Sequence, residues 1–541
     1  MKRTSYNTNE ESPIPDKYLK YQQHFKVVNN SNATSNTIFW GLGIENELYL
    51  EFQKKHTANK LDLINNVKRE RYSVDYYKSY NFEDYQDAIT NYIAEISHCN
   101  VTIPILLNAH SFVKTDKNNE PKNRYTKLCE PNPKFCGETL IETLQKENPY
   151  FEISKDREWL FDGDTVEFNT LAFYNAQLET VIEELSKHKS QFIYELNHTC
   201  KKIEYFPKYG ELQLMEQNHP FATYMTNFQQ MSMFNNGTLH FNITLPSHLN
   251  EHGKIADMDT FISKHRKAIK IIQWMEPFLI SMYGSPDPFS TIDDYPNAYK
   301  FSSASQRCAI SRYIGVGIYD TDTMERGKRL TKPIAEMELH TLPYWWFHEY
   351  YVDNAYVKLK EIGYDINFNK YNNHGIELRF LDHMSDVADI YESFEFLIYC
   401  MDIILENDDI ESFGNPIKTA IWNEFVTRTL IFGKNYMLTD MEKALYENLF
   451  DITLHVDNFK LVDIYYEIYG QLKSRYTKCT IENGVKTVKA IGPFSKFAIR
   501  PKHTICETDY PDIDIPDDDD ETSGKKDDVA SLEKRACCTI M

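Results

Sequence analysis

Four short segments of the chain alternate between polar and apolar residues, and this alternation constrains the fold more than any other feature. They are IFWGLGIENELYLEF at 38–52, LFDGDTVEFNT at 160–170, GTLHFNITLP at 237–246 and GIELRFLD at 375–382. Successive side chains of a strand point to opposite faces, so a period of two predicts strands with one polar and one apolar face. Apolar residues recur at helical spacing from Leu178, over 258–283 and over about 386–475. The chain is therefore expected to be an α+β protein with an antiparallel sheet.

The polar faces of these strands carry residues that suit metal and phosphate binding. Seven such residues are Glu45 and Glu47 in the first segment, Glu167 in the second, His240 and Asn242 in the third, and Glu377 and Arg379 in the fourth. Two carboxylates on one face of a strand repel each other unless a cation lies between them. Mg²⁺ and Mn²⁺ prefer such oxygen ligands. The pattern favours a divalent-metal site, although a sheet with one hydrated face alternates in the same way without any chemistry.

Strict alternation also assigns the faces of the fourth segment. It predicts Glu377, Arg379 and Leu381 on one face and Ile376, Leu378, Phe380 and Asp382 on the other.

The order of these segments resembles that in the glutamate–cysteine ligases and related carboxylate–amine ligases. GIENE resembles their opening G-x-E-x-E strand, GTLHFNITLP is similar to their G-x-H-x-N-x-x-x-P strand, and GIELRFLD is similar to their E-x-R-x-x-D strand. The resemblance covers about residues 38–383. It implies a glutamine-synthetase-like fold, in which a curved antiparallel sheet forms a funnel and helices pack on its outer face.

The resemblance also implies roles for individual residues. The implied metal ligands are Glu45, Glu47, Glu167, His240 and Glu377, which would hold Mg²⁺ or Mn²⁺. Arg379 and Asn242 would contact the co-substrate ATP. Arg379 would also act in catalysis, together with Arg307 and Arg312 from the looser match SQRCAISRYIG. Ordinary surface arginines are the alternative for the last two residues.

The implied activity is the ATP-dependent joining of a carboxylate to an amine through an acyl phosphate, with amino acids as the small-molecule substrates. No segment marks a cysteine-binding pocket, so the acceptor amine is open. One alternative is an amidoligase that acts on a peptide or protein. The other is a catalytically inactive scaffold tethered to a membrane.

Composition and charge bear on partners and location. The formal net charge of −21 disfavours nucleic-acid binding. Ten scattered cysteines without a C-x-x-C pair, and a polar start, predict a reducing cytoplasmic setting. The expected organisation is a flexible leader at 1–36, a ligase domain with a helical C-terminal part at 37–500, and an acidic disordered tail at 501–541.

The last four residues, Cys538-Thr539-Ile540-Met541, fit the C-a-a-X prenylation pattern, and a terminal Met favours farnesyl. We expect farnesylation of Cys538 in a eukaryotic cytosol, with Cys537 as a site for a second, palmitoyl anchor that would make membrane association stable. Intact-mass analysis of protein made in eukaryotic cells measures the farnesylation, with the Cys538→Ser variant as the control. The absence of a farnesyl-sized increment, with equal cytosolic distribution of both proteins, would contradict it.

Overall fold

A six-stranded antiparallel sheet organises the part of the chain that the structure describes. The computed structural model describes residues 38–59, 100–104, 106–107, 125–127, 130–131, 140–162, 165–171, 173–174, 176–204, 210–219, 237–286, 304–305, 319–326, 366–369, 374–407 and 414–505. The strand order is β14-β15-β11-β1-β9-β8. These strands are β14 (Ile366–Phe368), β15 (Ile376–Asp382), β11 (Thr238–His248), β1 (Ile38–Leu48), β9 (Thr165–Asn169) and β8 (Trp159–Asp162). Each of the four alternating segments therefore supplies strands to one sheet, and the mixed α+β class is confirmed.

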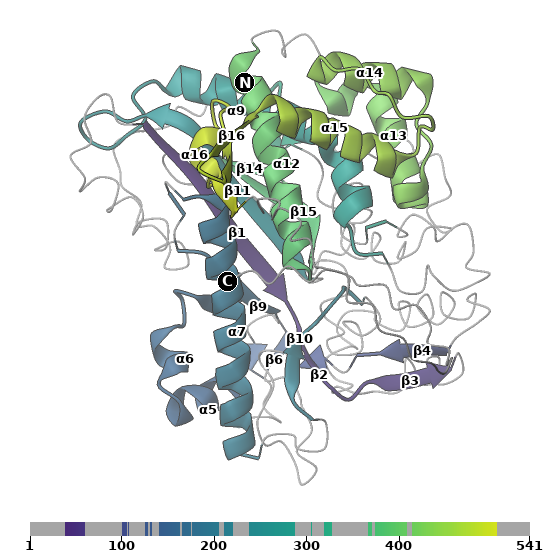
Figure 1. Cartoon of the computed structure of the whole chain (residues 1–541). Helices are drawn as coiled ribbons and strands as arrows, with labels where there is room; N and C mark the ends of the chain where they lie inside the picture. The colour runs from purple at the N-terminus through teal and green to yellow at the C-terminus, as the bar shows by residue number, and fades with distance from the viewer. Residues whose placement is uncertain are drawn as a thin grey trace, which may run out of the picture.

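Three long helices, α7 (Leu178–Lys202), α9 (Met258–Tyr283) and α12 (Val387–Glu406), cover the apolar face of this sheet (Figure 1). The expected helix at 258–283 is confirmed at both ends. Asp257 caps its first turn by accepting from the backbone N–H of Thr260 at 3.0 Å, and Gly284 follows its last residue. Asp386 caps α12 in the same way, through the N–H of Ala388.

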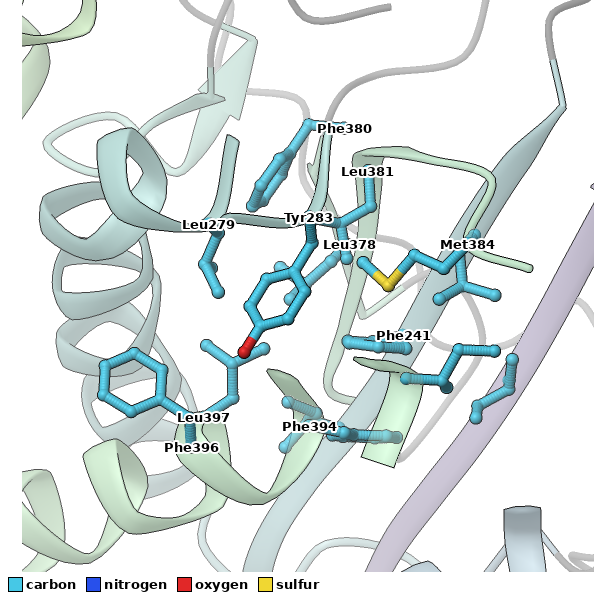
Figure 2. Close-up of a cluster of buried hydrophobic side chains, with 14 of the residues drawn as sticks. Phe241, Leu279, Tyr283, Leu378, Phe380, Leu381, Met384, Phe394, Phe396 and Leu397 are labelled. Atoms are coloured by element: carbon cyan, nitrogen blue, oxygen red, sulfur yellow. The ribbon is translucent and has the colours of Figure 1, made fainter. Parts of the chain in front are cut away.

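Aromatic and aliphatic side chains fill the space between the sheet and these helices. Phe241 of β11 stacks on Phe394 of α12 with ring centroids 4.2 Å apart, and Phe168 of β9 meets Phe192 of α7 edge to face. Figure 2 shows how Leu378 of β15 and its neighbours continue this packing against α9 and α12. Burial of this apolar layer is the main favourable contribution to folding of the sheet.

Further helices extend the helical layer beyond the sheet, as the spacing over 386–475 predicts. They are η11 (Pro416–Lys418), α13 (Ala420–Phe432), η12 (Gly433–Asn435), α14 (Asp440–Phe450) and α15 (Leu461–Arg475). Shorter elements accompany the sheet: β2 (Leu50–Phe52), β5 (Leu106–Leu107) and β10 (Leu212–Leu214) pair together, as do β3 (His56–Asn59) with β4 (Asn100–Ile103), β6 (Tyr125–Lys127) with β7 (Glu130–Pro131) and β12 (Tyr319–Asp320) with β13 (Glu325–Arg326). Helices α5 (Leu140–Glu147) and α6 (Tyr150–Ile153) lie beside α7.

Ordered structure runs past the predicted start of the tail at 501. A separate sheet contains β16 (Thr477–Glu482), β17 (Val485–Ala490) and β18 (Lys502–Ile505), with the short helix α16 (Ser495–Ala498) between its last two strands. Residues 502–505, which form β18, pair antiparallel with β17. The boundary at 500 was therefore wrong by at least five residues, because composition does not register strand pairing.

A β-bulge corrects the face assignment of β15. Two residues, Arg379 and Phe380, stand opposite the single residue His240 of β11. The extra residue shifts the alternation, so Leu381 pairs with the core residue Leu239 and is itself buried in the apolar layer. The prediction that Leu381 shares a face with Glu377 was wrong.

Several expectations concern residues outside the described ranges. These are the leader at 1–36, Arg307, Arg312, Cys537 and Cys538. Within the ranges that are described, no helix combines the length and apolar character needed to cross a membrane.

The stacked pair of Phe241 and Phe394 provides a test of the core. We expect Phe394→Ala to lower the free energy of unfolding by about 3–5 kcal/mol, because it removes a fully buried ring and leaves a cavity. Urea denaturation measures the change. The control is Met441→Ala on α14, where the side chain is 70% exposed and the expected change is within about 0.5 kcal/mol. Equal effects of the two substitutions would contradict the packing described.

Candidate functional site

The register of three neighbouring strands places four of the candidate residues side by side. On β1, Glu45 pairs directly with His240 of β11, and Glu47 pairs directly with Glu167 of β9. Directly paired residues of an antiparallel sheet share a face, with Cβ atoms about 4.5–5.5 Å apart. This face is opposite to the one that packs on the helices, so the four side chains gather away from the apolar core.

The fourth strand adds Glu377, which pairs with Asn242 next to His240 on the same face. Imidazole Nδ1 of His240 lies 3.3 Å from Oε2 of Glu45 and 3.7 Å from Oε1 of Glu377, while Nε2 lies 3.7 Å from Oε1 of Glu47. Glu45, His240 and Glu377 can each offer a ligand atom, and these atoms lie within 4.8 Å of one another. The structure thus brings together residues separated by more than 330 positions in the chain.

Neighbouring polar groups hold this cluster in place. Thr238 Oγ1 lies 3.0 Å from Nε2 of His240. Asn367 Nδ2 donates to Oε2 of Glu377 at 2.8 Å, and Arg379 Nη1 donates to Oε1 of the same carboxylate at 2.8 Å. Such outer partners fix the orientation of ligating side chains and tune their basicity.

Burial and charge set the protonation of the cluster. Glu45, His240 and Glu377 are at most 6% exposed. Burial, together with the Arg379 cation, lowers the pKa of His240 to about 4 against the opposing effect of Glu45 and Glu377, so the imidazole is neutral at pH 7. Burial works against a charged Arg379, but the carboxylates of Glu377, Glu47 and Glu45 outweigh it and hold the pKa of the guanidinium above its ordinary value.

The donor set fits a divalent cation. Mn²⁺ binds both a neutral imidazole and carboxylate oxygens. Mg²⁺ prefers the carboxylate oxygens of this set. Among the described residues, the carboxylates of Glu45, Glu47, Glu167 and Glu377 share this face, and the guanidinium of Arg379 is bonded to Glu377. A bound cation would offset the negative charge that this group concentrates in a buried place.

Asn242 occupies a more enclosed part of the same face. It is fully buried, and its Oδ1 accepts from Nε2 of His374 at 3.0 Å. The ring of Phe173 stacks on His374 and lies against Gly43, where a Cβ atom would stand 2.1 Å from that ring. The close approach of Phe173 therefore requires glycine at position 43. Asn242 is enclosed beside His374, on which Phe173 stacks.

Sequence reasoning missed Thr238, Asn367 and His374. Thr238 stands two positions before His240, so the period of two could have placed it on the same face. No comparable signal existed for Asn367, because β14 has only three residues.

The fold and the side-chain geometry define an α+β protein with a buried Glu–His–Glu group on the sheet face opposite the helices. No family model matches the chain. It is 34% identical over 451 residues to "Uncharacterized protein R704" of Acanthamoeba polyphaga mimivirus, in an alignment that covers 82% of this chain and 74% of the viral protein. The chain belongs to the same family as that protein. That relative is uncharacterized, so the side chains of the site carry the functional argument.

The Glu45–His240–Glu377 group can be tested by metal binding alone. We expect Glu45→Gln to weaken Mn²⁺ affinity at least about tenfold, because it removes one charged ligand while keeping the shape of the side chain. Thermal stability without metal should be unchanged or higher, since repulsion among carboxylates falls. Isothermal titration calorimetry measures the affinity.

The matched control is Glu251→Gln, whose side chain is 84% exposed in a turn that follows β11. Its Mn²⁺ affinity should equal that of the unsubstituted protein. Equal affinities for all three proteins would remove Glu45 from the metal site.

Proposed function

We propose that the chain is a divalent-metal- and ATP-dependent carboxylate–amine ligase of the glutamate–cysteine ligase type. The observation that supports this most is the convergence of Glu45, His240 and Glu377 from three paired strands, with Arg379 bonded to one of them. The sequence motifs of these strands resemble that class of ligase. The motifs do not by themselves require these side chains to meet in space, so their convergence is an independent reason for the proposal.

The fold part of the proposal is a glutamine-synthetase-like sheet. The described sheet is antiparallel throughout, and α7, α9 and α12 lie on one of its faces (Figure 1). The strand register puts the carboxylates on the other face. A funnel with outer helices requires this separation of faces. The proposal therefore places substrates on the face that bears Glu45 and His240.

Glu45, His240 and Glu377 would hold Mg²⁺ or Mn²⁺, and Glu47 and Glu167 would hold further cations on the adjoining strand pair. The cations would neutralise charge on the phosphate oxygens of ATP during transfer. The neutral state of His240 leaves a nitrogen lone pair available as a ligand. Arg379 stays charged in its carboxylate surroundings, and its planar guanidinium can donate two parallel hydrogen bonds to a phosphate.

The proposed reaction joins a carboxylate, which is a poor electrophile, to an amine in two steps. A substrate carboxylate oxygen attacks the γ-phosphorus of ATP, the bond to the bridging oxygen breaks, and ADP leaves. An amine then attacks the carbonyl carbon of the acyl phosphate and releases inorganic phosphate as the amide forms. Burial of the carboxylates and His240 would limit hydrolysis of the acyl phosphate by water. No protein nucleophile is required, since positioning and charge stabilisation suffice.

The experiment is incubation of the protein with Mg-ATP, glutamate and a panel of amino acids and amines. ADP release is measured, and mass spectrometry identifies products that gain the mass of the acceptor less water. Amide formation that needs both ATP and a divalent cation would support the proposal. A folded protein that binds Mn²⁺ but releases no ADP with free amines, peptides or proteins as acceptors would favour an inactive scaffold.

Arg379 gives a sharper prediction in the same assay. We expect Arg379→Lys to reduce kcat/KM for ATP at least about tenfold, because lysine keeps the charge but loses the bidentate fork. The control is Arg428→Lys on α13, a half-exposed residue that pairs with Glu424 one helical turn away. Wild-type kinetics for Arg379→Lys would exclude that guanidinium from contact with the transferring phosphoryl group.

A further inference from the structure

The C-terminal sheet of β16, β17 and β18 carries the opposite charge to the rest of the chain. Residues 477–505 contain six lysines or arginines and one acidic residue, Glu482, in a chain whose formal net charge is −21. The basic residues, all exposed, are Lys478, Lys486, Lys489, Lys496, Arg500 and Lys502. This part of the structure is called the basic sheet below.

Two of these lysines face each other without a counter-charge. Lys478 of β16 pairs directly with Lys489 of β17, an arrangement that costs stability because like charges stand side by side. On the same face, His503 of β18 pairs with Thr487. Within the described part of the chain, neither Lys478 nor Lys489 forms an ion pair, whereas Arg500 is bonded to Glu183 at 3.0 Å. An anionic group on this face would remove the repulsion.

The basic sheet is held firmly to the body of the protein. The buried carboxylate of Asp402 on α12 accepts from the backbone N–H groups of Phe494 at 2.6 Å and Ser495 at 2.9 Å. Tyr476 donates to Glu406 at 2.9 Å at the start of β16. The surface is therefore preformed, and a ligand need not order it.

The chain itself supplies a complementary anion directly after this sheet. Residues 507–521, ETDYPDIDIPDDDDE, contain nine acidic residues and no basic residue. They begin two positions after the last residue of β18. The densest acidic run, 517–521, starts 12 residues after Ile505, which allows it to reach at most about 40 Å. A six-residue strand such as β16 is about 20 Å long, so the run can reach any part of the basic sheet.

We infer that residues 507–521 dock on the basic sheet, with their carboxylates against Lys478 and Lys489. Attachment within the same chain gives the acidic segment an effective concentration of order millimolar. A separate anionic surface, such as a phospholipid bilayer, must displace it first. The docked segment masks a basic surface that would otherwise attract polyanions, and its contacts weaken with salt because they are exposed. This inference is independent of the ligase proposal.

The test is zero-length carbodiimide cross-linking of the full-length protein, followed by peptide mass spectrometry. We expect amide cross-links from Lys478 and Lys489 to acidic residues within 507–521 at low salt. Their yield should fall at least about fivefold in 0.5 M NaCl, where the screening length is only a few ångströms. Lys187 and Lys201, exposed on α7, serve as internal controls and should show no such links. Absence of the links, or equal yields at the α7 lysines, would overturn the inference.

Charge variants of the full-length chain separate the acidic segment from other occupants. The double variant Lys478→Glu with Lys489→Glu should abolish any cross-links between the acidic segment and the other lysines of the basic sheet. The double variant Lys187→Glu with Lys201→Glu should leave the cross-links to the basic sheet unchanged. Replacing 517–520 by asparagine and Glu521 by glutamine should increase co-sedimentation with vesicles of equal parts phosphatidylserine and phosphatidylcholine. If the unsubstituted protein binds these vesicles equally well through Lys478 and Lys489, the surface faces a membrane and the inference is wrong.

Discussion

The pleat of β1 is the constraint on which the rest of the structure depends. From Glu45 to Glu47 this strand is hydrogen-bonded on both sides, to β11 and to β9, so these side chains alternate between the two faces of the sheet. Ile44 and Leu48 pack in the apolar layer, while Glu45 and Glu47 point to the other side. Burying carboxylates costs several kcal/mol for each ion unless they are compensated. The apolar packing on the helix side keeps the strand in place despite that cost.

The same two-sided arrangement extends through β11 and β15. His240 sits opposite Glu45 because both strands obey one register, and that register is fixed by apolar residues such as Phe241 that must meet α12. The positions of the candidate ligands are thus set by packing on the reverse face of the sheet. Changes in the core would disturb the site through register rather than through direct contact.

Periodicity was sufficient to predict much of the fold. The strands that carry Glu45, Glu167, His240 and Glu377, and the helix at 258–283, follow from spacing alone because regular elements repeat regularly. The sequence could also group the candidate ligands on polar faces. It could not show that Glu45 would meet Glu377, since pairing across more than 330 residues depends on the order of strands in the sheet.

Irregular features could not be predicted from the sequence either, because they too depend on how strands pair. The bulge at Arg379 and Phe380 has no signature in the residues themselves, and it turned the expected face of Leu381. Asn367 supports Glu377 from a strand too short to show a period. β18 follows a turn and a short helix, so its residues 502–505 looked like part of an acidic tail until pairing with β17 placed them in a sheet.

The bulge also restricts which changes of length the protein family can tolerate. Because one residue is inserted into β15 opposite His240, the segment before it is in phase with the carboxylate face and the segment after it is in phase with the core. Loss of a single residue between Glu377 and Leu381 would put one of the two segments out of phase. A relative that keeps both the buried glutamate and the core leucine is therefore expected to keep the number of residues between them, even where their identities differ.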